Sequence, residues 1–145
     1  MSNIGKSGIP AFHAGSIKKR FLSDIDKMPR AGSSSWLRTL YRCLNNEFFE
    51  GKLPRVDVRW HSCQSRVMAK TLWGLHKGDK LHTPLTVWFD PLLKDKRLQK
   101  QVGMSMLHEM AHIKLGPAVE CREWHGEFDK EMFRLSAAGA FRYFW

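Results

Sequence analysis

The sequence predicts an α+β domain in which helices and strands occupy separate stretches of the chain. Residues 36–49 carry apolar side chains three and four positions apart, as on one face of a helix. Three short stretches of β character follow, and two more helical stretches come after them. Because loops of hairpin length separate the strands, we expect a small antiparallel three-stranded sheet. Helices segregated from strands in this way are typical of the α+β class.

The expected elements follow one another in a simple order. A Gly-Ser linker at 32–35 ends as a helix cap, and the first helix ends near Gly51 and Pro54. Alternation of apolar and polar residues predicts a strand at 55–60, and the stretches 66–73, which ends at Gly74, and 85–89 are the second and third strand candidates. Helical spacing then predicts a short turn at 92–94, a long helix at 98–115 and a last helix at 123–135. The sheet should therefore pack with an N-terminal helix, a long central helix and a C-terminal helix.

Length and composition indicate one folded domain with a basic extension. The chain has 145 residues, of which 43% are apolar, including six Trp and nine Phe. That content supports a single core in residues 34–145. Residues 1–33 are basic and rich in Gly and Ser, so we expect a loosely ordered extension with at most a short helix at 16–27. The three cysteines, Cys43, Cys63 and Cys121, form no C-x-x-C pair, which favours free thiols.

Two absences from the sequence bear on where the protein works. No stretch approaches the roughly 20 apolar residues of a membrane span. The first residues hold no apolar run of the signal-peptide type. We therefore expect a protein that is not secreted and has no membrane partner, located in the cytoplasm or associated with the nucleoid or nucleus.

The charge balance points to a polyanionic partner. Lys and Arg total 24 against 14 Asp and Glu, which gives a net charge of +10. A positive field of this size favours nucleic acid, so we expect DNA, single- or double-stranded, bound without sequence specificity. The candidate contacts are basic residues interleaved with Trp60 and Trp73, namely Arg55, Arg59, Arg66, Lys70, Lys77 and Lys80. The competing interpretation places the tryptophans in the core and leaves the charges as a solvated face.

His108, Glu109 and His112 form the pattern H-E-x-x-H within the long helix. Residues four apart share a face of a helix, so both imidazoles can reach one metal ion while Glu109 lies beside it. Imidazole nitrogen suits Zn²⁺, and a carboxylate next to the ion can take a proton from water. The pattern therefore predicts a zinc endopeptidase with Glu109 as the catalytic base. Tyr143 and His82 are candidates for stabilising the oxyanion.

A catalytic zinc site usually has three protein ligands and a water molecule. The extended metzincin pattern is absent after His112. His125 is the preferred third ligand, because Gly116-Pro117 lets the last helix turn back and pack against the long one. Glu131 in the last helix and a thiolate at Cys121 stay open as alternatives.

Three segments of the sequence resemble the SprT-like zinc metallopeptidases, including the Spartan branch of that family. The segments are LNNEFFEGKLP at 44–54 with VDVRW at 56–60, LHEMAH at 107–112, and HGEF at 125–128. Together they extend the resemblance over about residues 36–136. The loop between His112 and His125 is shorter than the family pattern, and residues 1–33 match nothing in it.

The resemblance implies a zincin-like metallopeptidase domain over residues 34–145. It also implies Zn²⁺ held by His108, His112 and His125, with Glu109 as the base. For the Spartan branch it implies DNA-dependent cleavage of proteins that are crosslinked to DNA. Two other functions fit the residues: a non-enzymatic, zinc-stabilised protein that binds nucleic acid or a regulatory partner, and a peptidase with a narrow protein target and no DNA role.

Overall fold

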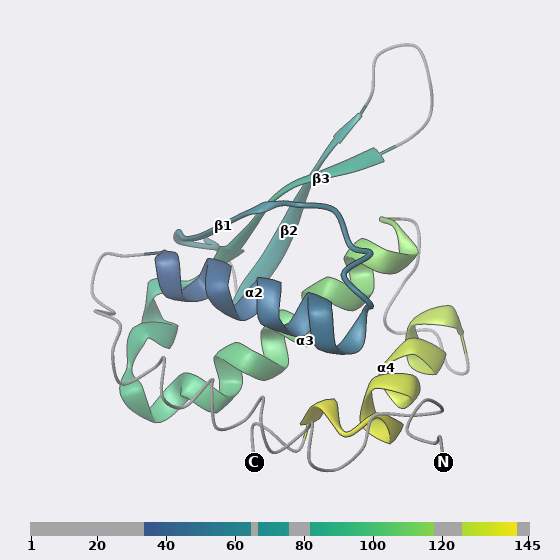
Figure 1. The fold of residues 1–145 in the computed structure, drawn as a ribbon. Coiled ribbons are helices and arrows are strands. Elements are labelled where there is room, and N and C mark those ends of the chain that lie inside the picture. The colour runs from purple at the N-terminus through teal and green to yellow at the C-terminus, as the bar shows by residue number, and fades with distance from the viewer. Residues whose placement is uncertain (1–33, 65–66, 76–81, 118–125, 142–145) are drawn as a thin grey trace.

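The computed structural model describes residues 34–64, 67–75, 82–117 and 126–141 (Figure 1). This part of the chain contains three α-helices, two short 3-10 turns and one three-stranded sheet. The α+β class is confirmed. The expected extension at 1–33, with its short helix, lies outside the described residues.

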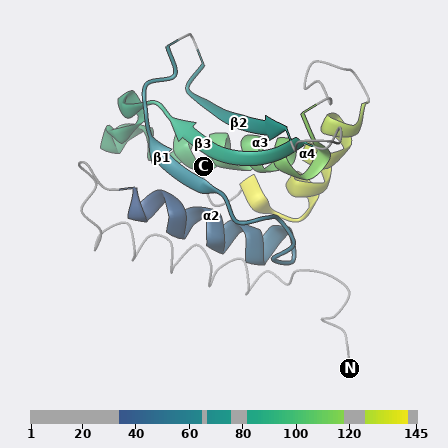
Figure 2. The same cartoon turned by 90° about the horizontal axis from the view of Figure 1, so that it is seen from above.

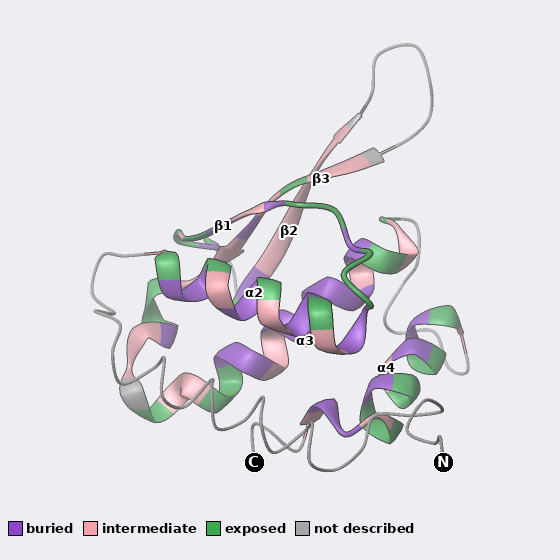
Figure 3. Ribbon diagram, viewed as in Figure 1, coloured by how far each residue is buried: buried purple, intermediate pink, exposed green. Residues whose placement is uncertain are grey.

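Helix α2 (Ser35–Phe48) is amphipathic, as its apolar spacing predicts. Figure 3 shows one buried face along it, formed mainly by aromatic and leucine side chains. The segment after the helix folds back onto it through two side chains. Asn45 exchanges two hydrogen bonds of 3.1 Å with the backbone of Leu53, and the Tyr41 hydroxyl donates to the carbonyl of Pro54 at 2.6 Å. These bonds fix the turn that leads into the sheet.

The sheet consists of β1 (Asp57–Trp60), β2 (Ala69–Leu75) and β3 (His82–Phe89). Its order is β1-β3-β2, with β2 antiparallel to β3 and β1 parallel to β3. The prediction of a purely antiparallel sheet is therefore wrong, because the sheet is mixed.

The strand order explains that difference. The chain reverses direction from β1 to β2 and again from β2 to β3, as short connections require. Since β3 takes the central position, it runs in the same direction as its neighbour β1. β3 is also strongly apolar on one side, where Val87 and Phe89 are fully buried. A central strand buries more apolar surface than an edge strand, which favours β3 in that place.

The long helix lies under the sheet. After the 3-10 turns η2 (Pro91–Lys94) and η3 (Lys96–Leu98), helix α3 (Gln99–Leu115) contacts β2, β3 and α2, and helix α4 (Glu127–Ala137) packs on α3. Figures 1 and 2 show α2 and α3 on the same side of the sheet. The short turn, the long helix and the last helix are thus confirmed, the last helix within residues 126–141.

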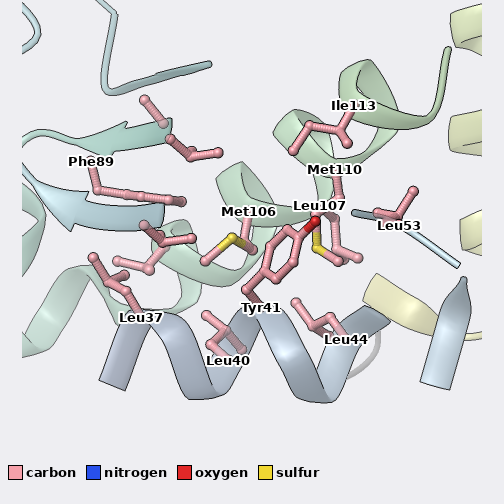
Figure 4. Packing of buried hydrophobic residues seen from close by; sticks show 14 of the residues in the cluster. Leu37, Leu40, Tyr41, Leu44, Leu53, Phe89, Met106, Leu107, Met110 and Ile113 are labelled. Carbon is pink, nitrogen blue, oxygen red and sulfur yellow. The ribbon is translucent and has the colours of Figure 1, made fainter. Parts of the chain in front are cut away.

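The core forms where α2, α3 and the sheet meet. Figure 4 shows Leu40, Tyr41 and Leu44 of α2 facing Met106 and Met110 of α3. Burying apolar side chains of this size stabilises the fold by about 1.5–3 kcal/mol each. None of the helices in the described ranges has the length and apolar character needed to cross a bilayer. Most sides of α3 are buried against α2, α4 and the sheet, and one face of the helix stays only half-buried.

Candidate active site

His108 and His112 lie together on that half-buried face of α3. Their ring centroids are 4.9 Å apart, with an angle of 67° between the ring planes. The neighbouring positions around the helix, including Met106 and Met110, are buried in the core. Because α3 is anchored on these other sides, the two imidazoles are held as a pair.

Phe128 of α4 contacts both imidazole rings. Its ring centroid lies 4.9 Å from that of His108 and 4.5 Å from that of His112. Phe128 is itself buried, so α4 is fixed against α3 at the point where the histidines emerge. The sequence placed Phe128 in the HGEF segment but assigned it no role.

Both imidazoles favour the neutral form. Burial lowers the pKa of His108 and of His112, and the nearby His108 ring lowers the pKa of His112 further. A neutral imidazole has a free lone pair, which is the state that binds zinc. The pair therefore fits a zinc ion in atom type, in protonation and in its position on one helix face.

Glu109 is buried between α3 and the sheet. Its exposed fraction is 7%, and the hydroxyl of Thr71 in β2 donates to Oε1 at 2.7 Å. Burial raises the pKa of Glu109, while hydrogen bonds from the side chain and from the backbone of Thr71 act in the opposite direction. The carboxylate is thus held in one orientation with a higher proton affinity than an exposed glutamate has.

A cavity of about 360 Å³ opens beside His108 and Glu109. The start of the β2 region, α3, α4 and the segment after α4 all contribute to its walls. Its apolar lining consists of Val67, Met68, Ala69, Met104, Met132 and Phe141. The candidate base therefore faces a cavity of the size that small ligands occupy in proteins.

Two of the three predicted metal ligands, His108 and His112, lie in the described residues. Within them, no group of three or more His, Cys, Asp or Glu side chains is placed to hold a metal ion. His125 and Cys121 both lie outside the described residues. His125 directly precedes Gly126, the N-cap residue of α4.

Glu131 is engaged elsewhere. Its carboxylate accepts hydrogen bonds from Lys114 at 2.7 Å and from Arg134 at 2.6 Å, and it is only 5% exposed. At about 100° per residue, Lys114 projects from α3 about 140° away from the midpoint between His108 and His112. A carboxylate neutralised by two cations on another face of the helix is a poor zinc ligand, which argues against this alternative.

The oxyanion candidates receive no support. Tyr143 lies outside the described residues. His82 is the first residue of β3, whereas Val87 pairs with Thr71 at the level of Glu109. A strand rises by about 3.3 Å per residue, so the backbone of His82 lies about 17 Å along the strand from that level.

The outer face of the sheet carries a basic and aromatic cluster. Trp88 is flanked across the strands by Arg59 of β1 and Lys70 of β2. His61 stacks on the indole with centroids 3.8 Å apart, and the Lys70 ammonium lies 5.2 Å from the ring centroid. Trp60, by contrast, packs against the core.

Some of the other residues predicted to contact nucleic acid lie in the described part of the chain, and some lie outside it. Arg55 is exposed, and Arg59 is exposed while forming an ion pair with Asp57. Arg66, Lys77 and Lys80 lie outside the described residues. The structure thus brings Arg59 and Lys70 together on one face.

Comparison with protein families found no family model that matches the chain. The chain is similar to the human DNA-dependent metalloprotease SPRTN. The two sequences are 35% identical over 104 residues, which is 70% of this chain and 20% of SPRTN. The match therefore spans about a fifth of SPRTN.

Proposed function

We propose that this chain is a zinc-dependent endopeptidase of the SprT-like family, with a zincin-like domain over residues 34–145. The observation that carries the proposal is a buried carboxylate, Glu109, next to two neutral imidazoles and a cavity. The similarity to a human metalloprotease supports the same class of reaction.

His108, His112 and His125 would hold the zinc ion. The position of His125 in the chain supports this role, because Phe128, three residues later, contacts the imidazoles of His108 and His112. The backbone at the start of α4 is thus close to the pair. A bound zinc ion supplies Lewis-acid activation of water and of the scissile carbonyl.

Glu109 acts as the general base. A raised pKa makes its carboxylate a stronger proton acceptor than an exposed glutamate. Thr71 holds one carboxylate oxygen and so limits rotation of the group. The carboxylate takes a proton from the attacking water, and the resulting acid returns it to the leaving amine.

The proposed substrates are proteins associated with DNA or crosslinked to it. The human relative is named as DNA-dependent, and this chain carries a net charge of +10. Arg59 and Lys70 flank an aromatic pair on the outer sheet face, where they can neutralise phosphates of either strand form. We place the protein in the cytoplasm or at the nucleoid or nucleus, where such substrates occur.

The test compares purified wild type with Glu109→Gln, both loaded with zinc. Casein and histones are incubated with each protein, with and without DNA, and the fragments are measured by mass spectrometry. Wild type should cleave both substrates, and Glu109→Gln should lose at least about 100-fold in rate, since it retains the shape of the side chain without its base. Equal cleavage by the two proteins contradicts the proposal.

A second candidate function rests on the outer face of the sheet. The stacked His61 and Trp88, with Lys70 beside them, suit a protein that binds nucleic acid without catalysis. In that case zinc would be structural, with four protein ligands and no water. Cys121 is the residue whose coordination would decide between the two functions.

A further inference from the structure

The cavity beside Glu109 has one polar wall, and its other walls are apolar. Its polar members, Ser105, His108 and Glu109, all belong to α3. The walls away from that side are apolar. A group entering the cavity therefore meets hydrogen-bonding atoms at one wall and hydrocarbon or thioether surface elsewhere.

Methionine makes up a large part of the apolar wall. Met68, Met104 and Met132 come from three different elements or segments and converge on the same space. Unbranched thioether side chains adapt to ligands of different shape. Such a wall favours apolar groups by hydrophobicity rather than by one fixed outline.

The rim of the cavity exposes apolar surface to solvent. Val67 is 46% exposed and Met68 is 37% exposed, directly before β2 begins at Ala69. Covering apolar surface of this kind with a ligand removes it from water, which makes the free energy of binding more favourable. Val67 and Met68 are more exposed than the other residues that line the cavity, and both lie on the strand side, where a substrate backbone would approach.

β2 offers a place for that backbone. It is hydrogen-bonded to β3 and, in the described part of the chain, to no other strand. An extended peptide can pair with the edge of a sheet and direct alternate side chains to one side. Because Ala69 both begins β2 and lines the cavity, a peptide along this edge would have a side chain at its mouth.

We propose that the cavity receives one large apolar side chain of the protein substrate, such as Leu, Met or Phe, next to the scissile bond. Met68, Met104 and Met132 determine this specificity. The inference rests on the proposed function, since it concerns the substrate of the same site. It adds that cleavage occurs preferentially beside apolar residues.

The first experiment measures binding without catalysis. Short fluorescein-labelled peptides of Gly and Ala, with either Leu or Ser at one central position, are titrated into the full, zinc-loaded chain carrying Glu109→Gln, which prevents cleavage, and binding is followed by anisotropy. The Leu peptide should bind at least about tenfold more tightly, as expected for an apolar side chain in an apolar pocket. Equal affinity for the two peptides overturns the proposal.

Two variants and a matched control locate the site. Met68→Glu at the exposed rim and Met132→Glu at the wall should each abolish the preference for Leu. Phe133→Glu introduces the same charge at the next residue of α4, where the side chain is 77% exposed, and should leave the preference intact. Thermal melting checks that each variant folds. Retention of the Leu preference in folded Met68→Glu contradicts the proposal.

The second experiment separates this inference from the proposed function. A peptide library is digested with zinc-loaded wild type and with Met68→Glu, and the residues flanking each cut are counted. Wild type should enrich Leu, Met or Phe on one side of the cut, and the variant should shift the preference to Lys or Arg. Cleavage without this enrichment removes the inference but leaves the peptidase. Absence of cleavage together with selective Leu binding removes the peptidase but leaves the apolar cavity as a binding site.

Discussion

Thr71 and Glu109 meet across the boundary between the sheet and the central helix. The hydroxyl donates to the buried carboxylate at 2.7 Å, although the two residues are 38 positions apart in the sequence. A hydrogen bond to a charged group contributes about 1.5–3 kcal/mol. At the residue scale, Thr71 is therefore a positioning residue that keeps the carboxylate aimed beside the imidazole pair.

The Thr71→Val substitution tests this role, because it removes the hydroxyl and keeps the shape. We expect kcat to fall by about 10- to 100-fold with little change in KM, since the bond orients the proposed base, Glu109, rather than the substrate. Thr71→Ser restores a hydroxyl at the same place and should recover most of the rate. Steady-state kinetics on a fluorogenic peptide supply both parameters. A Thr71→Val enzyme with unchanged kcat would show that Glu109 needs no such support.

The predictability of the site differs from residue to residue. His108, Glu109 and His112 could be predicted because helical spacing alone places them on neighbouring positions of one helix. Thr71 could not, since a contact between a strand and a distant helix has no local pattern. The cavity was missed for the same reason, because its wall is assembled from four separate segments.

At the scale of elements, one buried carboxylate connects three helices. Glu131 of α4 binds Lys114 of α3, and it also binds Arg134, whose guanidinium donates to the carbonyl of Phe48 at the end of α2. Burial by itself raises the pKa of Glu131, but the hydrogen bonds and charges of Arg134 and Lys114 outweigh it and lower the pKa below its ordinary 4.5. The ionised form is thus the one that holds α4 in place.

This contact predicts a loss of stability in acid. Because the folded pKa of Glu131 is lowered, its contribution is fully present above about pH 4.5 and is lost as the pH falls through the lower folded value. Glu131→Gln should reduce the free energy of unfolding at pH 7 by about 1–3 kcal/mol and make it less sensitive to acid. Urea denaturation between pH 7 and pH 3 measures both effects.

Glu127→Gln is the matched control for that measurement. Glu127 lies on the same helix, but its side chain is 66% exposed and pairs only with Lys130 among the described contacts. Exposed pairs contribute little, so its removal should change the stability by less than about 1 kcal/mol. If both variants behave alike, Glu131 does not hold the helices together.

The elements themselves were predicted well, and their arrangement was not. Helix α2 and helix α3 follow from apolar spacing, which depends only on neighbours in the chain. The parallel pairing of β1 with β3 depends on which strand becomes central, and short loops reverse the chain equally in either order. The antiparallel prediction failed at that step.

At the scale of the whole molecule, charge is the dominant property. The net charge of +10 predicts binding to DNA that weakens steeply as salt rises, because bound counterions are released. We propose that DNA binds at the outer face of the sheet, since Arg59 and Lys70 lie on either side of Trp88 there.

Removing those two charges should weaken DNA binding at this face. We expect the double variant Arg59→Gln with Lys70→Gln to bind less tightly and to reduce the salt slope by about 1–2. Lys130→Gln, an exposed charge on α4, serves as the control and should have a smaller effect. Anisotropy titrations with single- and double-stranded DNA at several salt concentrations measure the slope. Affinity that does not fall with rising salt would contradict an electrostatic surface.

The most direct measurement of the central claim is the zinc content of purified protein. Mass spectrometry of wild type, His112→Ala, His125→Ala and the exposed His61→Ala gives the number of zinc ions per chain. Wild type and His61→Ala should each carry a single equivalent, and both His112→Ala and His125→Ala should lose most of it, because each removes one of three ligands. A full equivalent of zinc in His112→Ala or in His125→Ala would contradict the proposed metal centre.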